Sequence, residues 1–192
     1  MRSESVTTPT SELVENTAYW HSSDTESTEV EVTALVAGFI RAVQPEFVLE
    51  TGSAFGQTTL AITSALRENG HGYLHSVDFT PERVADVNGK LEAAGLSAYG
   101  QVHQADASSW VPPEGTVFGF AWFDSDVATR YQEFHHYRQW MKSKTICGFH
   151  DMATYFEQAG GGQPRIELLV AEHMVNAIFL PTPRGVCFAE VL

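Results

Sequence analysis

The stretch FVLETGSAFGQTTLAI, residues 47–62, constrains the fold more than any other part of the sequence. Its apolar start is typical of a buried strand, its small residues Gly52, Ala54 and Gly56 of a tight turn, and its end of a helix. Small residues let a backbone approach a ligand closely, and a helix N-terminus offers unpaired N–H groups. The stretch therefore predicts an α/β domain with a ligand site at this turn.

The rest of the chain alternates between strand-like and helix-like segments, which predicts parallel strands covered on both faces. The end differs, because AIFLPTPRGVCFAEVL, residues 177–192, has two strand-like runs around PTPRG and predicts an antiparallel hairpin. A polar N-terminal arm, residues 1–30, is expected to precede one domain at residues 31–192. We expect a helix at 30–44, strands at 47–50, 72–78, 99–104, 118–124 and 145–151, and helices at 57–69, 81–94, 128–141 and 165–173.

Charge and hydropathy exclude several classes of function. The net charge of −13 disfavours nucleic acid and anionic membranes as partners, since both are bound through Lys and Arg. No apolar run reaches the length of a membrane span, and no basic-then-apolar leader begins the chain, so we expect a cytoplasmic protein. Cys147 and Cys187 lack metal-type spacing and are expected to be free buried thiols. A small-molecule acceptor, neutral or cationic, fits the charge best, and a homodimer is one expectation for the assembly.

The carboxylate of Glu50 narrows the ligand of the turn. A dinucleotide site would have the spacing G-x-G-x-x-G and a helix dipole facing pyrophosphate. Here the strand ends in Glu50, which would repel pyrophosphate and attract a cation. The expected ligand is therefore positively charged near the turn.

The run LETGSAFGQTT resembles the first motif of class I S-adenosylmethionine-dependent methyltransferases, acidic-x-Gly-x-Gly-x-Gly, with Ala54 in place of the middle glycine. The resemblance implies a Rossmann-like α/β fold with a seven-stranded, mostly parallel sheet, a C-terminal antiparallel hairpin and helices on both faces. It also implies S-adenosylmethionine as the cofactor. Glu50, Gly52 and Ser53 would contact the amino acid moiety, and Gly56 completes the set of cofactor-binding residues in the turn.

Two more acidic residues follow predicted strands. Asp78 lies at the tip of the neighbouring strand, where a carboxylate can accept both ribose hydroxyls, and the alternative, that it caps the helix that starts at Pro81, is compatible with this role. The resemblance implies the ribose role and places Phe79 against adenine. Asp106 resembles the family residue that meets the adenine amino group, with Ala107 beside it; the alternative for Asp106 is an Asx turn.

A second acidic group follows the fourth and fifth strands. Asp124 and Asp151 are both expected at the carboxyl edge of the sheet, with no strongly basic neighbours in sequence, so they should repel each other unless a cation lies between them. The two strand ends resemble those of metal-dependent O-methyltransferases of the catechol and natural-product sugar types. That resemblance implies that Asp124 and Asp151 hold a divalent cation such as Mg²⁺.

The general base is less clearly marked. The resembling enzymes tend to carry histidine or lysine three residues after the first aspartate, where this chain has Val127. His150 is the substitute candidate because its ordinary pKa suits proton removal at neutral pH; the alternative is a histidine that caps a strand end. His150 and Asp124 are thus the predicted catalytic residues.

The expected function is methyl transfer from S-adenosylmethionine to an oxygen of a small molecule, with assistance from a divalent metal. Three alternatives stay open at this point. They are a metal-independent small-molecule methyltransferase, a protein of this fold that binds the cofactor with a different activity or none, and a nicotinamide-dependent oxidoreductase, for which the glycine spacing fits least.

Overall fold

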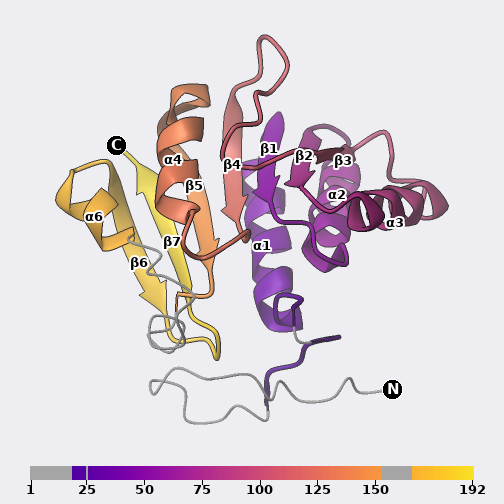
Figure 1. Cartoon of the computed structure of the whole chain (residues 1–192), viewed down its shortest axis with the longest axis horizontal. Coiled ribbons are helices and arrows are strands. Elements are labelled where there is room, and N and C mark those ends of the chain that lie inside the picture. The colour runs from indigo at the N-terminus through magenta and orange to yellow at the C-terminus, as the bar shows by residue number, and fades with distance from the viewer. Residues whose placement is uncertain (1–18, 25, 153–165) are drawn as a thin grey trace.

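A computed structural model of the chain describes residues 19–24, 26–152 and 166–192. In this part of the chain, seven strands form one sheet in the order β3-β2-β1-β4-β5-β7-β6 (Figure 1). Strands β1 to β5 run parallel to one another, and β7 runs antiparallel to both β5 and β6. The bounds are β1 Phe47–Thr51, β2 Tyr73–Asp78, β3 Gly100–Gln104, β4 Phe118–Phe123, β5 Met141–His150, β6 Val175–Leu180 and β7 Val186–Val191. The predicted fold class, including the C-terminal hairpin, is confirmed.

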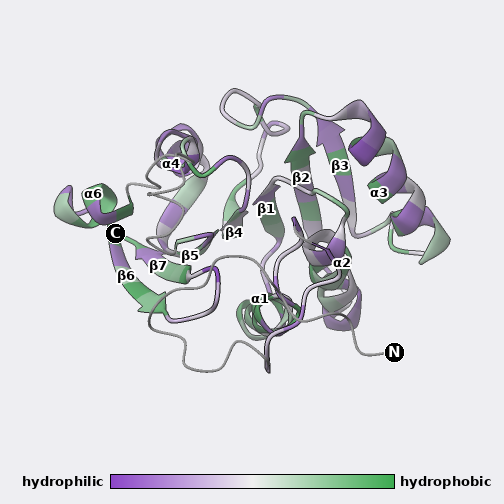
Figure 2. Cartoon of the chain, turned by 60° about the horizontal axis from the view of Figure 1, so that its bottom comes forward, coloured by the Kyte–Doolittle hydropathy of each residue, from purple (hydrophilic) through white to green (hydrophobic). Residues whose placement is uncertain are grey.

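Helices cover both faces of this sheet. On one face α1 (Val30–Val43) and α2 (Gln57–Asn69) bury Val36, Ile40 and Ile62 in one hydrophobic core. On the other face α4 (Arg130–Tyr137) and α6 (Ile166–Ala171) bury their apolar side chains in a second core. Helix α3 (Pro81–Ala93) packs against the edge strand β3. Figure 2 shows apolar strands in the middle and hydrophilic stretches along the outer sides of α2 and α3. Among the described helices, none has the length and apolar character needed to cross a membrane.

The sheet order determines where a ligand can bind. Strand β1 pairs with β2 on one side and with β4 on the other, so the strand order reverses between β1 and β4. In open α/β sheets, ligands bind outside the carboxyl ends of the strands at such a reversal. The glycine turn follows β1 directly, which places it at this position.

The predicted boundaries differ most from the structure between β4 and β5. The helix expected at 128–141 is α4, which ends at Tyr137 and continues as a short 3-10 helix, Arg138–Trp140. The reason is that Met141 already pairs with Phe118 in the sheet, so β5 begins four residues before the predicted start. The register between β4 and β5 shifts after this pair.

The segment before α1 lies against the carboxyl edge of the sheet (Figure 1). Residues 1–18 of the predicted arm lie outside the described residues. Within the described part, Ser27, Thr28 and Glu29 are at most 4% exposed. These three residues are therefore part of the folded domain.

Candidate functional site

The glycine turn has the backbone that its sequence suggests. Gly52 and Gly56 have φ of 81° and 85°, and Ala54 also lies in the left-handed region with φ of 44°. A Cβ on Gly52 would lie 2.5 Å from the backbone oxygen of Asp124, so the ends of β1 and β4 approach as closely as a glycine allows. Ala54 adopts a conformation that glycine would adopt with less strain. The turn therefore accommodates alanine at the middle position at some energetic cost.

Asp78 holds this turn from the neighbouring strand. Its Oδ2 accepts hydrogen bonds from the backbone N–H groups of Ser53 and Ala54, both at 3.1 Å, and from the Ser53 hydroxyl at 3.2 Å. Its Oδ1 accepts from the N–H of Thr80 at 2.9 Å, which forms an Asx turn before α3, while the helix itself has no side-chain cap. The alternative that Asp78 caps this helix is therefore wrong, and its carboxylate holds the glycine turn instead.

A cavity of about 610 Å³ opens beside the turn. Gly52, Ala54, Asp78, Phe79, Asp106 and Ala107 line it together with residues that follow β4 and β5, among them Asp124 and Asp151. Phe79 is 76% exposed, an unusual setting for a large aromatic side chain. Asp106 lines the same cavity while its Oδ1 accepts from the N–H and hydroxyl of Ser108, so the predicted Asx turn is present as well.

Glu50 lies beneath the turn and is fully buried. Its Oε2 accepts from the hydroxyls of Thr59 and Ser76, both at 2.6 Å, whereas Oε1 has no hydrogen-bond partner among the described residues. Burial raises the pKa of Glu50 to about 7, and the nearby carboxylates of Asp124 and Asp78 add to this despite the two hydroxyl donors. A buried acceptor oxygen without a partner is costly unless a ligand completes it, and a cation beside it would restore the charged form.

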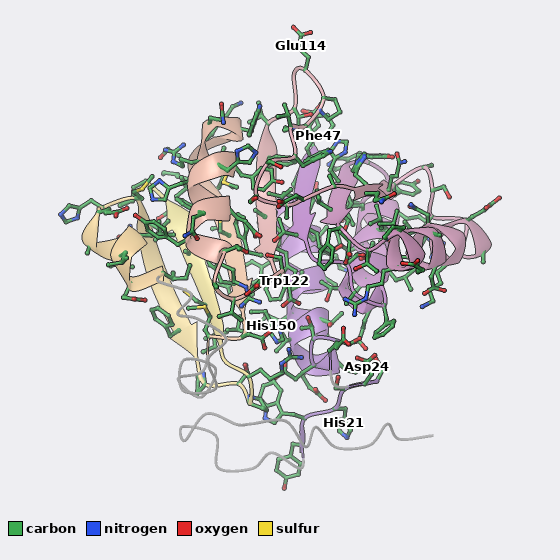
Figure 3. All side chains as sticks on the ribbon, in the orientation of Figure 1. His21, Asp24, Phe47, Glu114, Trp122 and His150 are labelled. Atoms are coloured by element: carbon green, nitrogen blue, oxygen red, sulfur yellow. The ribbon has the colours of Figure 1, made fainter. Side chains whose placement is uncertain are left out.

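The residues predicted at the far end of the site converge. One ligand atom each from Asp124, His150 and Asp151 lies within 4.8 Å of the others. Figure 3 shows His150 at the carboxyl end of the sheet, near the segment with His21 and Asp24 and opposite the end marked by Phe47 and Glu114. The acidic cluster that the sequence predicted is therefore present.

Two arginines that the sequence analysis did not consider lie in this cluster. Arg184, in the turn between β6 and β7, donates to Asp151 through Nε at 2.6 Å and Nη2 at 2.9 Å. Arg130, at the start of α4, is fully buried, and its Nη2 lies 3.4 Å from Asp124 and 3.5 Å from Asp151. Burial alone would raise the pKa of Asp151, but His150, Arg184 and Arg130 lower it to about 2.

His150 is enclosed by carboxylates. Its Nδ1 lies 3.0 Å from Asp124, and its Nε2 lies 2.7 Å from Glu29, which is fully buried. Burial disfavours the imidazolium, but Asp124 and Asp151 outweigh it, and the pKa of His150 rises to about 10. His150 is therefore protonated at neutral pH and is not among the described residues that line the cavity. This arrangement argues against its predicted role as a general base, because both ring nitrogens already donate.

The predicted cofactor residues differ in how directly they face the cavity. Glu50, Ser53 and Gly56 are not among the residues that line it. Gly56 begins α2, where a Cβ would lie 2.9 Å from the side chain of Val87, so its glycine serves the packing of α2 against α3. Val127, at the position of the absent base, is 8% exposed and belongs to the buried apolar residues.

Comparison with known proteins identifies the class that this fold and site define. The model of a family described as a methyltransferase domain matches residues 49–152, just over half of the chain. The matched span contains the glycine turn, Asp78, Asp106 and the cluster of Asp124 and Asp151. The chain belongs to this family of S-adenosylmethionine-dependent methyltransferases. No curated protein sequence matches it significantly.

Solved structures share the fold at low sequence identity. The O-methyltransferase TomG from Streptomyces achromogenes, in complex with S-adenosylmethionine, is 14% identical with a TM-score of 0.75, over 86% of this chain and 82% of that chain. An O-methyltransferase from Bacillus cereus, in complex with S-adenosylhomocysteine, is 16% identical with a TM-score of 0.73, over 88% and 84% of the two chains. The methyltransferase PaMTH1 from Podospora anserina is 13% identical with a TM-score of 0.74, over 87% and 80%.

The residues of this chain fit the cofactor. The cavity next to the turn has the volume of a typical small-molecule site. Its lining combines an exposed aromatic ring, two strand-end carboxylates and a backbone free of side chains at Gly52. Glu50 does not line the cavity, but its partnerless oxygen lies beneath the turn, where it is an acceptor suited to an ammonium group. S-adenosylmethionine carries each matching group: a base, a ribose and a cationic amino acid moiety.

Proposed function

We propose that this methyltransferase transfers the methyl group of S-adenosylmethionine to an oxygen of a small molecule. The observation that carries the proposal is that one cavity contains both the cofactor-type residues, such as Asp78 and Phe79, and the charged cluster of Asp124, Asp151 and Arg184. A cofactor placed on the first group would have its reactive end near the second. The O-methyltransferases among the structural neighbours support this choice of acceptor atom.

The cofactor supplies the chemistry, a methyl group on a sulfonium that a nucleophile displaces in line. The protein supplies alignment and electrostatic control, which can account for most of the rate in such a transfer. Glu50 and Gly52 would position the amino acid moiety, Asp78 the ribose, and Phe79 and Asp106 the adenine. Ala107 would lie beside the base, and Ser53 would act through its contact with Asp78.

The acceptor end of the cavity carries charged groups of both signs. The proton acceptors among its described lining residues are carboxylates, including Asp124, Asp126 and Glu133. A carboxylate is a weak base, so it removes a proton efficiently only from a hydroxyl that ionises readily. The guanidinium of Arg184 in the same lining would stabilise the resulting oxygen anion. We infer an acceptor with an acidic hydroxyl, such as a phenol.

A divalent ion would have to be held by Asp124, Asp151 and His150. Such an ion would lower the pKa of an acceptor hydroxyl. Both oxygens of Asp151 are bonded to Arg184, and both nitrogens of His150 face carboxylates. Asp124 accepts from Thr28 through Oδ2 and contacts Arg130 and His150 through Oδ1, so every ligand atom of this set already has a protein partner. We therefore derive no step of the transfer through a metal.

The experiment is methyl transfer from radiolabelled S-adenosylmethionine to a panel of phenols, sugar hydroxyls and amines, with mass spectrometry of the products. We expect labelled methyl ethers, greatly reduced transfer by Asp78→Asn, and unchanged transfer by the control Asp86→Asn on the outer side of α3, whose carboxylate is half-exposed. Labelled amines would contradict the choice of oxygen. Cofactor binding without transfer to any acceptor would favour a protein of this fold with a different activity.

The cellular setting and assembly also belong to this proposal. The absence of a membrane-crossing helix among the described residues and the negative charge support a cytoplasmic protein that acts on small molecules. A homodimer stays a prediction. Ile178 and Phe179 on the edge strand β6, 68% and 53% exposed, offer apolar surface for it. Sedimentation velocity measures the assembly directly.

A further inference from the structure

The carboxylates at the end of β4 and β5 are neutralised by the protein itself. Asp124, Asp151 and Glu29 lie together with Arg130, Arg184 and His150, and each of the three carboxylates contacts at least one of these three basic side chains. The sequence alone suggested a metal because no cation was evident between the acidic residues. The folded chain brings cations to this position from α4 and from the turn between β6 and β7.

Arg184 forms the tighter of the two arginine contacts. It meets Asp151 through two parallel donors, at 2.6 Å and 2.9 Å, which is the bidentate geometry that an arginine fork favours. Its Nη1 donates to the carbonyl oxygens of Ser27 at 3.1 Å and Glu26 at 3.3 Å, and its backbone N–H donates to Glu29 at 3.1 Å. Arg184 thus links Asp151 to the segment before α1, and it is held from several sides.

Arg130 takes the position between the two aspartates. Its Nη2 lies 3.4 Å from Asp124 and 3.5 Å from Asp151 and donates to the carbonyl oxygen of Ser125 at 3.0 Å. A bridging Mg²⁺ would approach oxygens of both aspartates to about 2.1 Å, so it would compete with this nitrogen for the same space. Nε and Nη1 of Arg130 have no hydrogen-bond partner among the described residues. The guanidinium is buried and cannot lose its proton, so it adds a permanent positive charge here.

We propose that Arg130 and Arg184 take the place of a divalent ion in this chain, so that methyl transfer requires no metal. A metal would have to remove Arg184 from Asp151 and Arg130 from between the aspartates, which would leave two buried guanidinium groups without their anions. It would also break the link through Arg184 between Asp151 and the carbonyl oxygens of Glu26 and Ser27. The part of this inference that concerns turnover rests on the proposed function, whereas the part that concerns metal binding does not.

The test is titration with Mn²⁺ as the probe, followed by electron paramagnetic resonance of the free ion. The proteins are the wild type, Arg184→Gln, and the double variant Arg184→Gln with Asp151→Asn. We expect the wild type and the double variant to show the same weak binding to surface carboxylates. Arg184→Gln should gain one site that is about tenfold or more tighter, because both oxygens of Asp151 become available.

Arg184→Lys covers the case in which Arg184→Gln does not fold, as judged by circular dichroism. Lysine keeps the charge but cannot form the two-donor fork, so we expect a smaller gain in Mn²⁺ affinity that Asp151→Asn again removes. A tight wild-type site that Asp151→Asn abolishes would overturn the proposal. So would the absence of any gain in the folded Arg184 variants.

Turnover adds a second measurement once an acceptor is found. We expect the rate of methyl transfer by the wild type to be unchanged by EDTA and by added Mg²⁺. Loss of turnover in EDTA that Mg²⁺ restores would overturn the proposal. If no acceptor is methylated, the proposed function fails, and the Mn²⁺ titration still decides whether the arginines hold the metal position.

Discussion

Protonation of Glu50 should control how tightly the cofactor binds. The carboxyl is fully buried, and burial together with nearby carboxylates raises its pKa to about 7. A cationic amino acid moiety beside it would favour the ionised form and so lower that pKa on binding. Binding below pH 7 then requires Glu50 to lose a proton. The affinity for S-adenosylmethionine should therefore fall as the pH falls through 7.

The size of this effect follows from the fraction of Glu50 that is ionised before binding. With a pKa of about 7, roughly one-tenth of the protein is competent at pH 6 and about three-quarters at pH 7.5. The dissociation constant should thus rise about eightfold between pH 7.5 and pH 6. The α-amino group of the ligand, with a pKa of about 7.7–8.0, is almost fully charged at pH 6 and about two-thirds charged at pH 7.5, which reduces the expected rise to about sixfold.

Isothermal titration calorimetry in buffers of different ionisation enthalpy measures both the affinity and the protons released. We expect release of about 0.9 proton per cofactor at pH 6 and less at pH 7.5. Glu50→Gln keeps the shape and removes the charge, so it should bind weakly at both pH values and release no proton. A wild-type affinity independent of pH would refute this reasoning, as would a pH dependence that Glu50→Gln retains.

Three further predictions concern stability, measured by urea denaturation. Gly52→Ala should lower the free energy of unfolding by about 1–3 kcal/mol more than Gly70→Ala does. Both glycines have positive φ, but only a Cβ at Gly52 meets the backbone of Asp124, so equal losses would contradict the close approach of β1 and β4. Ala54→Gly should stabilise the fold by about 0–1 kcal/mol, because the strain removed from the left-handed backbone at Ala54 slightly exceeds the entropic cost of a more flexible unfolded chain. A clear loss of stability would mean that the methyl group of Ala54 packs against its neighbours. Glu29→Ala should cost about 3 kcal/mol at pH 7, because it leaves buried partners without their anion. Burial alone would raise the pKa of Glu29, but its partner His150 lowers the pKa overall. The stabilisation by Glu29 is therefore present above its ordinary pKa of 4.5 and is lost as the pH falls through the lowered value. A Glu29→Ala variant that keeps the acid sensitivity of the wild type would contradict this assignment.

The parts of the site that follow from local sequence could be predicted. The turn was predicted because the small residues Gly52, Ala54 and Gly56 follow a strand directly in the sequence. The structure has positive φ at all three. The convergence of Asp124 and Asp151 was predicted because parallel strands end at one edge of a sheet. Both steps use periodicity and strand direction, which are properties that a sequence displays.

Arg184 and Glu29, two partners in this cluster, could not be found in this way, because they come from segments remote in sequence. Arg184 is 33 positions from Asp151, and Glu29 is 121 positions from His150. No periodicity links such segments. One signal was available for Arg130. It shares the spacing of Phe134 and Tyr137 on the buried stripe of α4, and an arginine on a buried stripe implies a buried anion.

The most direct test of the central claim is a crystal structure grown with S-adenosylhomocysteine and Mn²⁺, with anomalous data for manganese. The account predicts the cofactor product in the cavity, with adenine between Phe79 and Asp106 and the amino acid moiety at Glu50 and Gly52. It predicts no manganese peak at Asp124, where Arg130 should remain. A ligand bound elsewhere, or a manganese ion in place of the arginine contacts, would contradict it.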